Sequence, residues 1–400
     1  MSVLFSPVKI GKIEIKNRFV HSATGEGAAL ENGEVSEKLI KRYRALAKGE
    51  IGLIIPGYFY IHPRGKTMRG QPGLHNDDMI KGLSKLVDAV HNEGSKIAIQ
   101  LVHAGQQTTK EYIGGLTPLA PSGGSKDFFY NVTPKKMSEK DIDKIIKSFG
   151  AAAKRTYEAG ADAVQLHAAH GYLINQFLSP FFNKRNDGWG GTDEKRFRFL
   201  KETFLEVKKN IPNDMPILIK LNTQDYTPSE GITLSLARKY AQWLADIGIN
   251  GIEVSCGTLS YSMFNIFRGE IPAKELSMAF PMEKKESVYQ FLMTIKEKYN
   301  FTEGYTADAA RLIRPVIGDV PLFLVGGMRR VVHMEKTVEN GDADFISMSR
   351  PFIKEPLIVK KFREGTIESA SCVSCNKCFA AIVNHMPLAC YNKLITQEEF

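Results

Sequence analysis

The segment QLHAAHGYLINQF brings two histidines and a tyrosine close together along the chain. His167 and His170 are three residues apart, and Tyr172 follows two residues later. Neutral imidazoles can donate hydrogen bonds to a carbonyl oxygen, and a phenol can supply a proton. The end of one strand and the turn after it could present all three groups to one ligand. Each histidine alone also fits a buried structural role, so it is the grouping that favours catalysis.

Two apolar runs end in residues that suit an anion. Gly326 and Gly327 end the run PLFLVGG, and Ser349 and Arg350 end the run DFISMSR. Backbone N–H groups can approach an anion closely at paired glycines, and an arginine can bind it through two N–H donors. We therefore expect a phosphorylated ligand. A Gly-Gly turn beside a solvated arginine is the alternative.

Gln100 and Lys220 lie inside the apolar runs KIAIQLVH and PILIKLN. A buried amide needs hydrogen-bond partners, and a planar heterocycle offers donors and acceptors along one edge. An unpaired buried ammonium is costly, so Lys220 also needs a partner. A buried lysine can instead serve as a Schiff-base nucleophile, which leaves an aldolase-like function open. A purely structural role for either residue is a further alternative.

Eight short apolar runs recur along the chain, and amphipathic stretches typical of helices lie between them, as in 36–49 with Ser36 as its expected N-cap. No antiparallel pairing signal stands out. Eight strand-helix units predict a (β/α)8 TIM barrel, with an open doubly wound sheet as the alternative. The glycine fingerprint of a dinucleotide fold is absent. The expected strands are 19–24, 51–57, 96–103, 161–168, 216–222, 251–255, 321–327 and 344–350.

Two intervals, 104–137 and 256–303, are too long for ordinary connections between a strand and a helix. In a barrel, such insertions lie over the C-terminal face of the strands and can form lids. We therefore predict a barrel domain over 1–363, with loop insertions over that face. A short extension over 364–400 carries most of the cysteines.

The composition is that of an ordinary globular protein: 400 residues, of which 43% are hydrophobic and 24% charged. No apolar run approaches the roughly 18 residues that span a bilayer, and no secretion signal is evident. We expect a cytoplasmic protein without a membrane partner. The net charge of +9 is spread along the chain without a long basic block, which predicts no nucleic-acid partner and suits phosphorylated ligands.

Four of the five cysteines gather near the C-terminus, while Cys256 lies alone in the middle of the chain. In an intracellular chain, such clustering indicates metal or redox chemistry in preference to a disulfide framework. Free or redox-labile thiols are the alternative. The clustered cysteines are Cys372, Cys375, Cys378 and Cys390.

Several segments closely resemble the Old Yellow Enzyme family of FMN-dependent oxidoreductases. They are HAAHGYLINQFLSPFFNKRNDGWGG (167–191), LFSPVKIGKIEIKNRFVHSAT (4–24), IAIQLVHAG (97–105) and DFISMSRPFIKEP (344–356). The likeness extends from about residue 3 to residue 360. It implies a barrel that holds FMN without a covalent bond, with NADH or NADPH as the reductant and an electron-poor alkene as the oxidant.

The resemblance also implies a role for each matching position. His167 and His170 would bind the carbonyl oxygen of an α,β-unsaturated carbonyl substrate. Flavin N5 would deliver hydride to the β-carbon once the nicotinamide has left, and Tyr172 would protonate the α-carbon. The expected FMN contacts are Ala23 and Thr24 beside the ring, the backbone of Gly57 and Tyr58, Gln100 and Lys220 at the pyrimidine edge, and Gly326, Gly327, Ser349 and Arg350 at the phosphate.

Three positions depart from the family pattern. Lys220 stands where the family usually has arginine, which keeps the charge and loses the two-pronged hydrogen-bond geometry. Gly25 and Gly27 stand where one branch of the family has a cysteine that tunes the flavin and a tyrosine.

The cysteine segment, with gaps of two, two and eleven residues, resembles the iron-sulfur segment of the 2,4-dienoyl-CoA reductase branch. Four thiolates suit a [4Fe–4S] cluster or zinc. In that branch the cluster relays electrons from an FAD and NADPH module, which we do not find in this sequence. The leading hypothesis is a stand-alone ene-reductase. A dienoyl-CoA-type reductase and an electron-transfer flavoprotein subunit are the alternatives, and the sequence leaves a homo-oligomer open.

Overall fold

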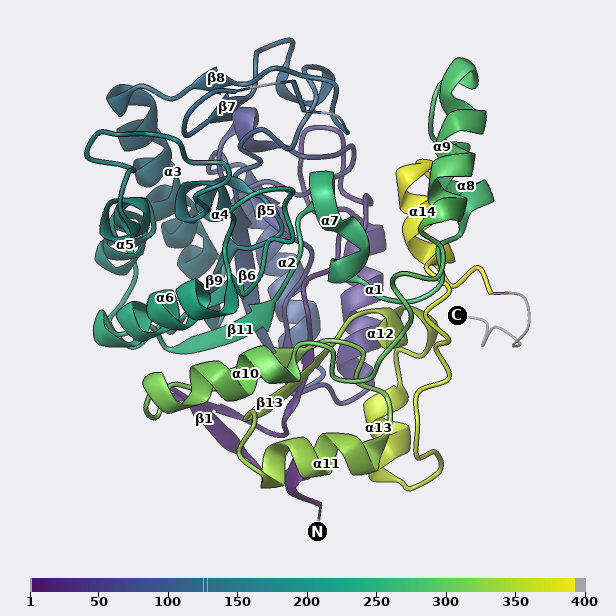
Figure 1. The fold of residues 1–400 in the computed structure, drawn as a ribbon. Helices are drawn as coiled ribbons and strands as arrows, with labels where there is room; N and C mark the ends of the chain where they lie inside the picture. Colours follow the sequence, from purple (N-terminus) through teal and green to yellow (C-terminus); the bar gives the residue numbers. More distant parts are fainter. Residues whose placement is uncertain (1, 125, 128, 393–400) are drawn as a thin grey trace.

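Eight parallel strands close into a barrel in the computed structural model, which describes residues 2–124, 126–127 and 129–392 (Figure 1). Each strand falls inside a predicted run. Pairing of β13 with β3 and of β4 with β6 closes the ring, which confirms the barrel and excludes the open sheet. The strands are β3 (Phe19–His21), β4 (Leu53–Ile54), β6 (Lys96–Val102), β9 (Ala163–Ala168), β10 (Ile217–Asn222), β11 (Gly251–Ser255), β12 (Leu322–Val325) and β13 (Phe345–Met348).

Helices cover the outside of the barrel, and their amphipathic sequences explain why. In the first of them, Ser36 is the N-cap as predicted: its hydroxyl accepts the backbone N–H of Leu39 at 3.3 Å. No helix in the described ranges is both long and apolar enough to cross a membrane. The helices of this layer are α1 (Glu37–Lys48), α2 (Met79–His91), α3 (Glu139–Glu158), α4 (Leu173–Leu178), α5 (Asp193–Asn210), α6 (Leu234–Asp246), α10 (Ala307–Ile313), α11 (Val331–Glu339), α12 (Arg350–Lys354) and α13 (Ile358–Arg363).

A hairpin that the sequence analysis does not predict closes one end of the barrel. Its strands, β1 (Val8–Ile10) and β2 (Ile13–Ile15), pair antiparallel and have only three residues each, too few for a clear alternating pattern. Ile10 and Ile15 pack into the barrel interior on residues of β3, β4, β6, β9, β10, β12 and β13. The floor of the barrel is therefore apolar and filled.

The polarity of the interior changes one layer above that floor. Side chains two residues apart on a strand point to the same face. Val20, Ala98, Ala163 and Leu218 belong to the apolar floor. Two residues further along the same strands, the interior positions are polar: they are occupied by Ser22, Gln100, Gln165 and Lys220. The barrel thus holds a buried polar layer directly beneath its C-terminal end.

The two predicted insertions carry short elements of their own. The first holds η3 (Glu111–Ile113), β7 (Leu119–Ala120) and β8 (Lys135–Lys136), and the second holds α7 (Leu259–Ile266), α8 (Ala273–Ser277) and α9 (Met282–Thr294). Figure 1 shows β7 and β8 at the end of the molecule opposite β1. The remaining short elements are η1 (Val3–Phe5), η2 (Pro63–Gly65), η4 (Arg314–Val316) and β5 (Phe59–Tyr60).

The tail forms one helix, α14 (Lys377–Val383), which lies beside α8 and α9 (Figure 1). Ala380 of α14 shares a small apolar cluster with Leu276 of α8 and Leu292 of α9. Asn376, just before α14, is buried and donates to the backbone oxygens of Phe267 and Glu270, each at 3.0 Å. The described tail residues, 364–392, are thus joined to the second insertion. The division into domains at residue 363 remains a prediction, and residues 393–400 of the extension lie outside the described part.

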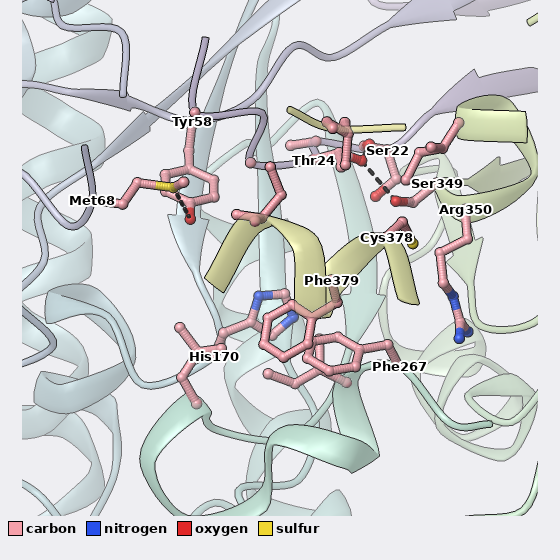
Figure 2. A pocket seen from close by; sticks show the side chains of 18 of the residues that line it. Ser22, Thr24, Tyr58, Met68, His170, Phe267, Ser349, Arg350, Cys378 and Phe379 are labelled. Carbon is pink, nitrogen blue, oxygen red and sulfur yellow. Dashed lines mark hydrogen bonds between the residues drawn. The ribbon is translucent and has the colours of Figure 1, made fainter. Parts of the chain in front are cut away.

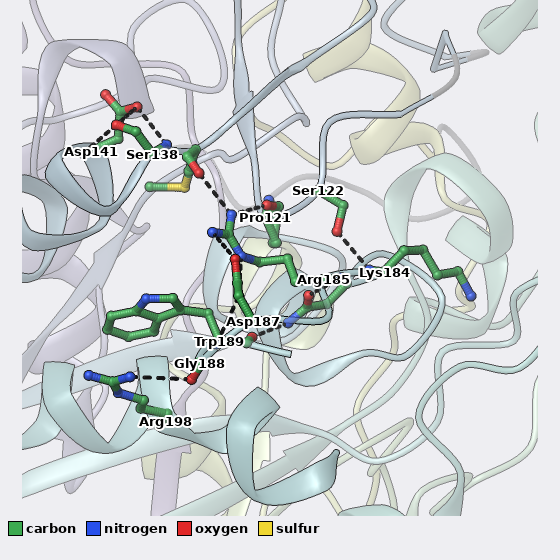
Figure 3. A network of polar contacts seen from close by, with 12 residues as sticks. Pro121, Ser122, Ser138, Asp141, Lys184, Arg185, Asp187, Gly188, Trp189 and Arg198 are labelled. Atoms are coloured by element: carbon green, nitrogen blue, oxygen red, sulfur yellow. Dashed lines mark hydrogen bonds and ion pairs between the residues drawn. The ribbon is translucent and has the colours of Figure 1, made fainter. Parts of the chain in front are cut away.

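Arg185 ties the first insertion to the barrel (Figure 3). One terminal nitrogen donates to the backbone oxygens of Pro121 at 2.6 Å and Met137 at 2.8 Å. The rest of the guanidinium binds Asp187 through two hydrogen bonds, of 3.0 and 2.7 Å. Because Arg185 is only 5% exposed, this contact fixes both ends of the 121–137 segment from below.

Candidate active site

A cavity of about 590 Å³ lies at the C-terminal end of the barrel strands, and most of the predicted site residues line it (Figure 2). Of the residues predicted to contact FMN or act in catalysis, three are not among its walls: Gly57, Gln100 and Gly326. One tail cysteine, Cys378, does line it. The predicted residues in the walls are Ala23, Thr24, Tyr58, His167, His170, Tyr172, Lys220, Gly327, Ser349 and Arg350.

The two histidines and the tyrosine come together as the sequence analysis expects. The ring centroids of His167 and His170 are 5.1 Å apart, and those of His167 and Tyr172 are 4.7 Å apart. His167 Nδ1 accepts the backbone N–H of Ala169 at 3.3 Å, so a neutral His167 carries its proton on Nε2. His170 adopts a left-handed backbone (φ 62°), and its Nε2 lies 2.7 Å from Ser255 Oγ.

Both imidazoles are neutral at physiological pH. Burial lowers the pKa of His167 well below its ordinary value of 6.5, and the nearby His170 and Lys220 lower it further. Burial and Lys220 likewise lower the pKa of His170 well below 6.5. A neutral imidazole offers one N–H, so each ring can donate one hydrogen bond without bringing a full charge into the cavity.

Tyr172 retains its proton over a wide pH range. Burial raises the pKa of its phenol well above 10, and the neighbouring phenols of Tyr58 and Tyr130 raise it further. The Tyr172 hydroxyl donates to the Tyr58 hydroxyl at 3.2 Å, and the Tyr58 hydroxyl lies 3.6 Å from the sulfur of Met68. Tyr172 is therefore a proton-bearing group with an oriented hydroxyl.

Lys220 has a partner that the sequence analysis missed. Its ammonium nitrogen lies 3.3 Å from Glu253 Oε2 and donates to Ser22 Oγ at 2.8 Å. Both charged side chains are almost fully buried, with 3% and 0% exposed. The Lys220 nitrogen is thus already engaged by a carboxylate and a hydroxyl, whereas a Schiff-base nucleophile needs a free amine facing its substrate. The geometry therefore does not support the aldolase-like function.

The buried amides continue this polar layer. Gln165 Nε2 donates to Glu253 Oε2 at 3.0 Å, and Gln100 Nε2 donates to Gln165 Oε1 at 2.6 Å. The remaining oxygen of Gln100, Oε1, is buried and has no hydrogen-bond partner among the described residues. Gln100 thus lies in the layer beneath the cavity and presents an unused acceptor there.

The other end of the cavity is basic. Arg350 and Arg329 both line it, and Arg329 was not predicted. Arg350 donates to Asn376 Oδ1 at 2.6 Å, so the tail orients the arginine. At the same end, Thr24 Oγ1 and Ser349 Oγ are hydrogen-bonded at 2.7 Å (Figure 2). Two guanidinium groups with hydroxyls nearby suit a phosphate.

Close packing explains the glycines. Gly327 has a left-handed backbone (φ 75°), and a Cβ there would lie 2.7 Å from the backbone oxygen of Thr302. A Cβ on Gly57 would lie 2.3 Å from the backbone oxygen of Thr24. Gly57 therefore allows the loop after β4 to pack on the loop after β3, which supports the cavity wall from behind. Gly326 packs in the same way on Thr306.

The first insertion adds Tyr130 to the wall, and Asp127 holds it there. Asp127 Oδ1 accepts the backbone N–H groups of Phe129 and Tyr130, each at 2.9 Å. Its Oδ2 accepts the hydroxyl of Ser260 at 2.8 Å. Ser260 belongs to α7, so one carboxylate joins the two insertions above the barrel.

The tail cysteines gather beside the cavity without forming a metal-holding group. All five cysteines lie in the described part of the chain, and none forms a disulfide. Burial raises the pKa of Cys378 to about 12, and the nearby Cys372 and Cys375 add to that effect. Within 2–124, 126–127 and 129–392, no three His, Cys, Asp or Glu side chains are arranged to hold a metal ion.

Four residues of this region escaped the sequence analysis. Glu253 is the one charged residue in the apolar run GIEVS. Lys220 was selected because it lies in an apolar run, and the same criterion could have selected Glu253. Ser255 ends that run, and Arg329 follows the Gly-Gly pair by two residues. Both residues lie at or just after the end of an expected strand, which is where the other candidate residues were found. Tyr130 carries no local signal, since only the folding of the insertion brings it to the cavity.

The model of the NADH:flavin oxidoreductase / NADH oxidase family matches residues 3–268. The chain belongs to this family. It resembles the NADH oxidase of Thermoanaerobacter brockii with 34% identity over 93% of this chain and 52% of the relative. With the NADPH dehydrogenase of Bacillus subtilis strain 168, identity is 33% over 89% of this chain and 93% of the relative. The chain thus spans about half the length of the first relative and most of the second.

Two solved structures also resemble this chain in fold. A 2-naphthoyl-CoA reductase complex aligns with a TM-score of 0.83 and 26% identity, over 97% of this chain and 56% of that protein. An old yellow enzyme homologue from Zymomonas mobilis aligns with a TM-score of 0.73 and 23% identity, over 93% of this chain and 95% of the homologue. The resemblance to Old Yellow Enzymes is therefore confirmed, and membership places the chain among the NAD(P)H:flavin oxidoreductases.

Proposed function

We propose that this family member reduces the C=C bond of α,β-unsaturated carbonyl compounds, with FMN as its cofactor and NAD(P)H as its reductant. The observation that carries the proposal is the neutral pair His167 and His170 with the protonated Tyr172 on one wall of a cavity. The opposite end of that cavity bears Arg329 and Arg350. One site thus combines carbonyl recognition, a proton donor and a phosphate site.

The residues present fit FMN. The unpartnered buried oxygen of Gln100 and the ammonium of Lys220 suit the donors and acceptors of the pyrimidine edge. The backbone at Gly327 and the guanidinium of Arg350, which both line the cavity, suit the phosphate. Bound FMN would supply hydride transfer between the nicotinamide and the alkene. The expected contacts of Ala23, Thr24, Gly57, Tyr58, Gly326 and Ser349 belong to the same proposal.

The protein's own side chains would bind the substrate carbonyl oxygen and supply the proton. His167 Nε2–H donates to the substrate carbonyl oxygen. His170 donates beside it from Nδ1–H, while its Nε2 accepts the hydroxyl of Ser255. Both hydrogen bonds withdraw electron density from the conjugated alkene. Tyr172 holds its proton until the α-carbon becomes basic enough to accept it. Tyr58 orients the Tyr172 hydroxyl through their hydrogen bond.

Anaerobic absorption spectroscopy tests the proposal. We expect flavin bands that bleach with NADPH or NADH and recover on addition of cyclohexenone. The double substitution His167→Ala and His170→Ala should abolish the binding of phenols, which we would measure from the change in the flavin spectrum. His333→Ala, on α11 outside the barrel, is the control and should bind phenols as the native chain does. Unchanged phenol binding in the double variant, or a protein without flavin, would refute the proposal.

A second candidate is an enzyme that receives electrons through Cys372, Cys375, Cys378 and Cys390. Cys378 favours it, because this thiol lines the same cavity. Four thiols are suitable donors for a [4Fe–4S] cluster or zinc. The described residues are not arranged to hold a metal, so no electron-transfer step follows from the structure.

Metal analysis of anaerobically purified protein distinguishes the two candidates. About four iron atoms and four sulfides per chain, or one zinc, would support a metal site in the tail. Reduction by NAD(P)H without turnover of any enone would instead favour an electron-transfer flavoprotein subunit. Neither metal, together with turnover of cyclohexenone, supports the stand-alone reductase.

A further inference from the structure

The buried ion pair beneath the cavity contains one residue that the proposed function leaves unused. Lys220 and Glu253 are direct neighbours on the paired strands β10 and β11, with Nζ and Oε2 3.3 Å apart. Lys220 lines the cavity, whereas Glu253 lies behind it. An ammonium has three N–H donors, and the structure provides partners for two of them, at Ser22 and Glu253. One donor is left for a bound molecule.

Glu253 also determines which way the neighbouring amides point. A carboxylate only accepts hydrogen bonds, so Gln165 must turn its NH2 group toward Glu253. The oxygen of Gln165 then faces Gln100, which donates a hydrogen bond to it from its own NH2 group. Gln100 Oε1 is left over as an acceptor. One negative charge thus orients two amides and leaves an acceptor suited to an N–H group of a ligand.

We propose that Glu253 is a positioning residue that sets the reduction potential of bound FMN by cancelling the charge of Lys220. The inference rests on the proposed function, since it requires FMN against Lys220. Reduction by two electrons and one proton adds one negative charge to the flavin ring. A lone ammonium would favour that form strongly. Paired with a carboxylate 3.3 Å away, the ammonium favours it much less, and the potential is lower.

Burial makes this effect local and resistant to salt. Both side chains have 3% or less of their surface exposed, and the layer below them is apolar. Mobile ions screen exposed charges over about 8–10 Å but barely reach a buried pair. The charge balance between Lys220 and Glu253 should therefore act on the cavity at any ionic strength.

Redox titration with a reference dye tests the proposal. In Glu253→Gln the midpoint potential of bound FMN should shift upward, because Lys220 is left unpaired. In Lys220→Gln it should shift downward, because the carboxylate remains alone. The double variant should return toward the native potential. Each shift should persist from low to high salt. Glu339→Gln, which makes the same charge change at the exposed end of α11, is the control and should leave the potential unchanged.

Three outcomes would overturn the proposal: a Glu253→Gln potential equal to or below the native one, shifts that vanish at high salt, or a double variant displaced further than either single variant. If Glu253→Gln fails to retain FMN, Lys220→Gln compared with the double variant isolates Glu253, whose removal should then raise the potential. A native chain that binds no FMN would refute the proposed function itself. Native FMN binding and enone turnover with unshifted potentials would refute only the role of Glu253.

Discussion

At the scale of single residues, burial controls the chemistry of the site. The same desolvation that keeps His167 and His170 neutral keeps Tyr172 protonated, so three groups of ordinary type become donors over a wide pH range. Lys220 lies in the same buried layer, where its ammonium nitrogen is 3.3 Å from Glu253 Oε2. The histidines and Tyr172 could be selected from the sequence, since they are close along the chain. Their protonation could not, because it depends on burial by distant segments.

The pH dependence of turnover follows from these shifts. The pKa values of His167 and His170 are lowered, so protonation on acidification should begin only well below pH 6.5. The pKa of Tyr172 is raised, so loss of its proton should begin only above pH 10. We expect kcat/KM for cyclohexenone to be flat from about pH 6.5 to about pH 9.5. A stopped-flow measurement of flavin reoxidation would check it. A step near pH 6.5 would show that a histidine titrates normally and would contradict the burial argument.

At the scale of elements, local sequence pattern predicts the barrel strands, whereas long-range contacts determine how the two insertions, 104–137 and 256–303, pack over the barrel. All eight strands fall in the predicted runs because their apolar residues are contiguous in the sequence. The hairpin at Ile10 and Ile15 was missed because its strands are too short, and β7 and β8 have only two residues each. The packing of the two insertions depends on contacts such as the hydrogen bond between Asp127 and Ser260, which are 133 residues apart in the sequence. Such a pair leaves no periodic signal.

Arg185 provides a test of how the lid is held. Arg185→Ala would leave the buried backbone oxygens of Pro121 and Met137 without their donor, and we expect a loss of about 2–4 kcal/mol in the free energy of unfolding. For Arg185→Lys we expect a loss in the free energy of unfolding smaller than that for Arg185→Ala, because an ammonium keeps the charge but lacks the planar fork of donors. Urea unfolding measures both. Hydrogen exchange in the 119–137 segment should rise in parallel.

Arg198→Ala is the matched control for the Arg185 variants. This arginine lies over the Trp189 ring at 4.1 Å and is about half exposed, so its removal should cost less than about 1 kcal/mol (Figure 3). Equal losses for Arg185→Ala and Arg198→Ala would show that the contacts with Pro121 and Met137 do not hold the insertion.

At the scale of the whole molecule, the barrel, the second insertion and the tail all contribute residues to the walls of one cavity. Strand ends supply its chemistry, and α14 supplies a wall that includes Cys378 and Phe379 (Figure 2). Asn376 links the three parts, since it contacts Arg350 of α12 as well as the backbone of the second insertion. The sequence analysis expected an appended tail. It had no means to show that the tail reaches the cavity.

Acid stability should depend on histidines buried in this framework. His21 lies between Tyr43 and Phe352, and burial lowers its pKa to about 3. The unfolded chain, in which the pKa of histidine is about 6.5, therefore binds more protons between pH 6.5 and pH 3. Stability is fully present above pH 6.5 and is lost as the pH falls, by about 4–5 kcal/mol from His21 alone.

Substitution of His21 isolates this contribution. In His21→Asn the amide can still donate to the backbone oxygen of Ile55, which His21 Nδ1 contacts at 2.9 Å, but it cannot take up a proton. We expect a variant that is less stable at pH 7.5, because packing is lost, and whose stability falls less steeply between pH 6.5 and pH 4. Urea unfolding across that range measures both effects. Parallel pH curves for the variant and the native chain would refute the assignment.

The apolar floor of the barrel closes the end of the barrel opposite the cavity. Ile10 and Ile15 fill that end, so a ligand cannot reach the cavity along the barrel axis from the floor. Under the proposed function, the electron donor and the electron acceptor bind in turn in the same cavity, beside His167 and Tyr172. Steady-state kinetics should then be ping-pong, with parallel double-reciprocal lines, and an excess of either reactant should slow the cycle by occupying the site out of turn.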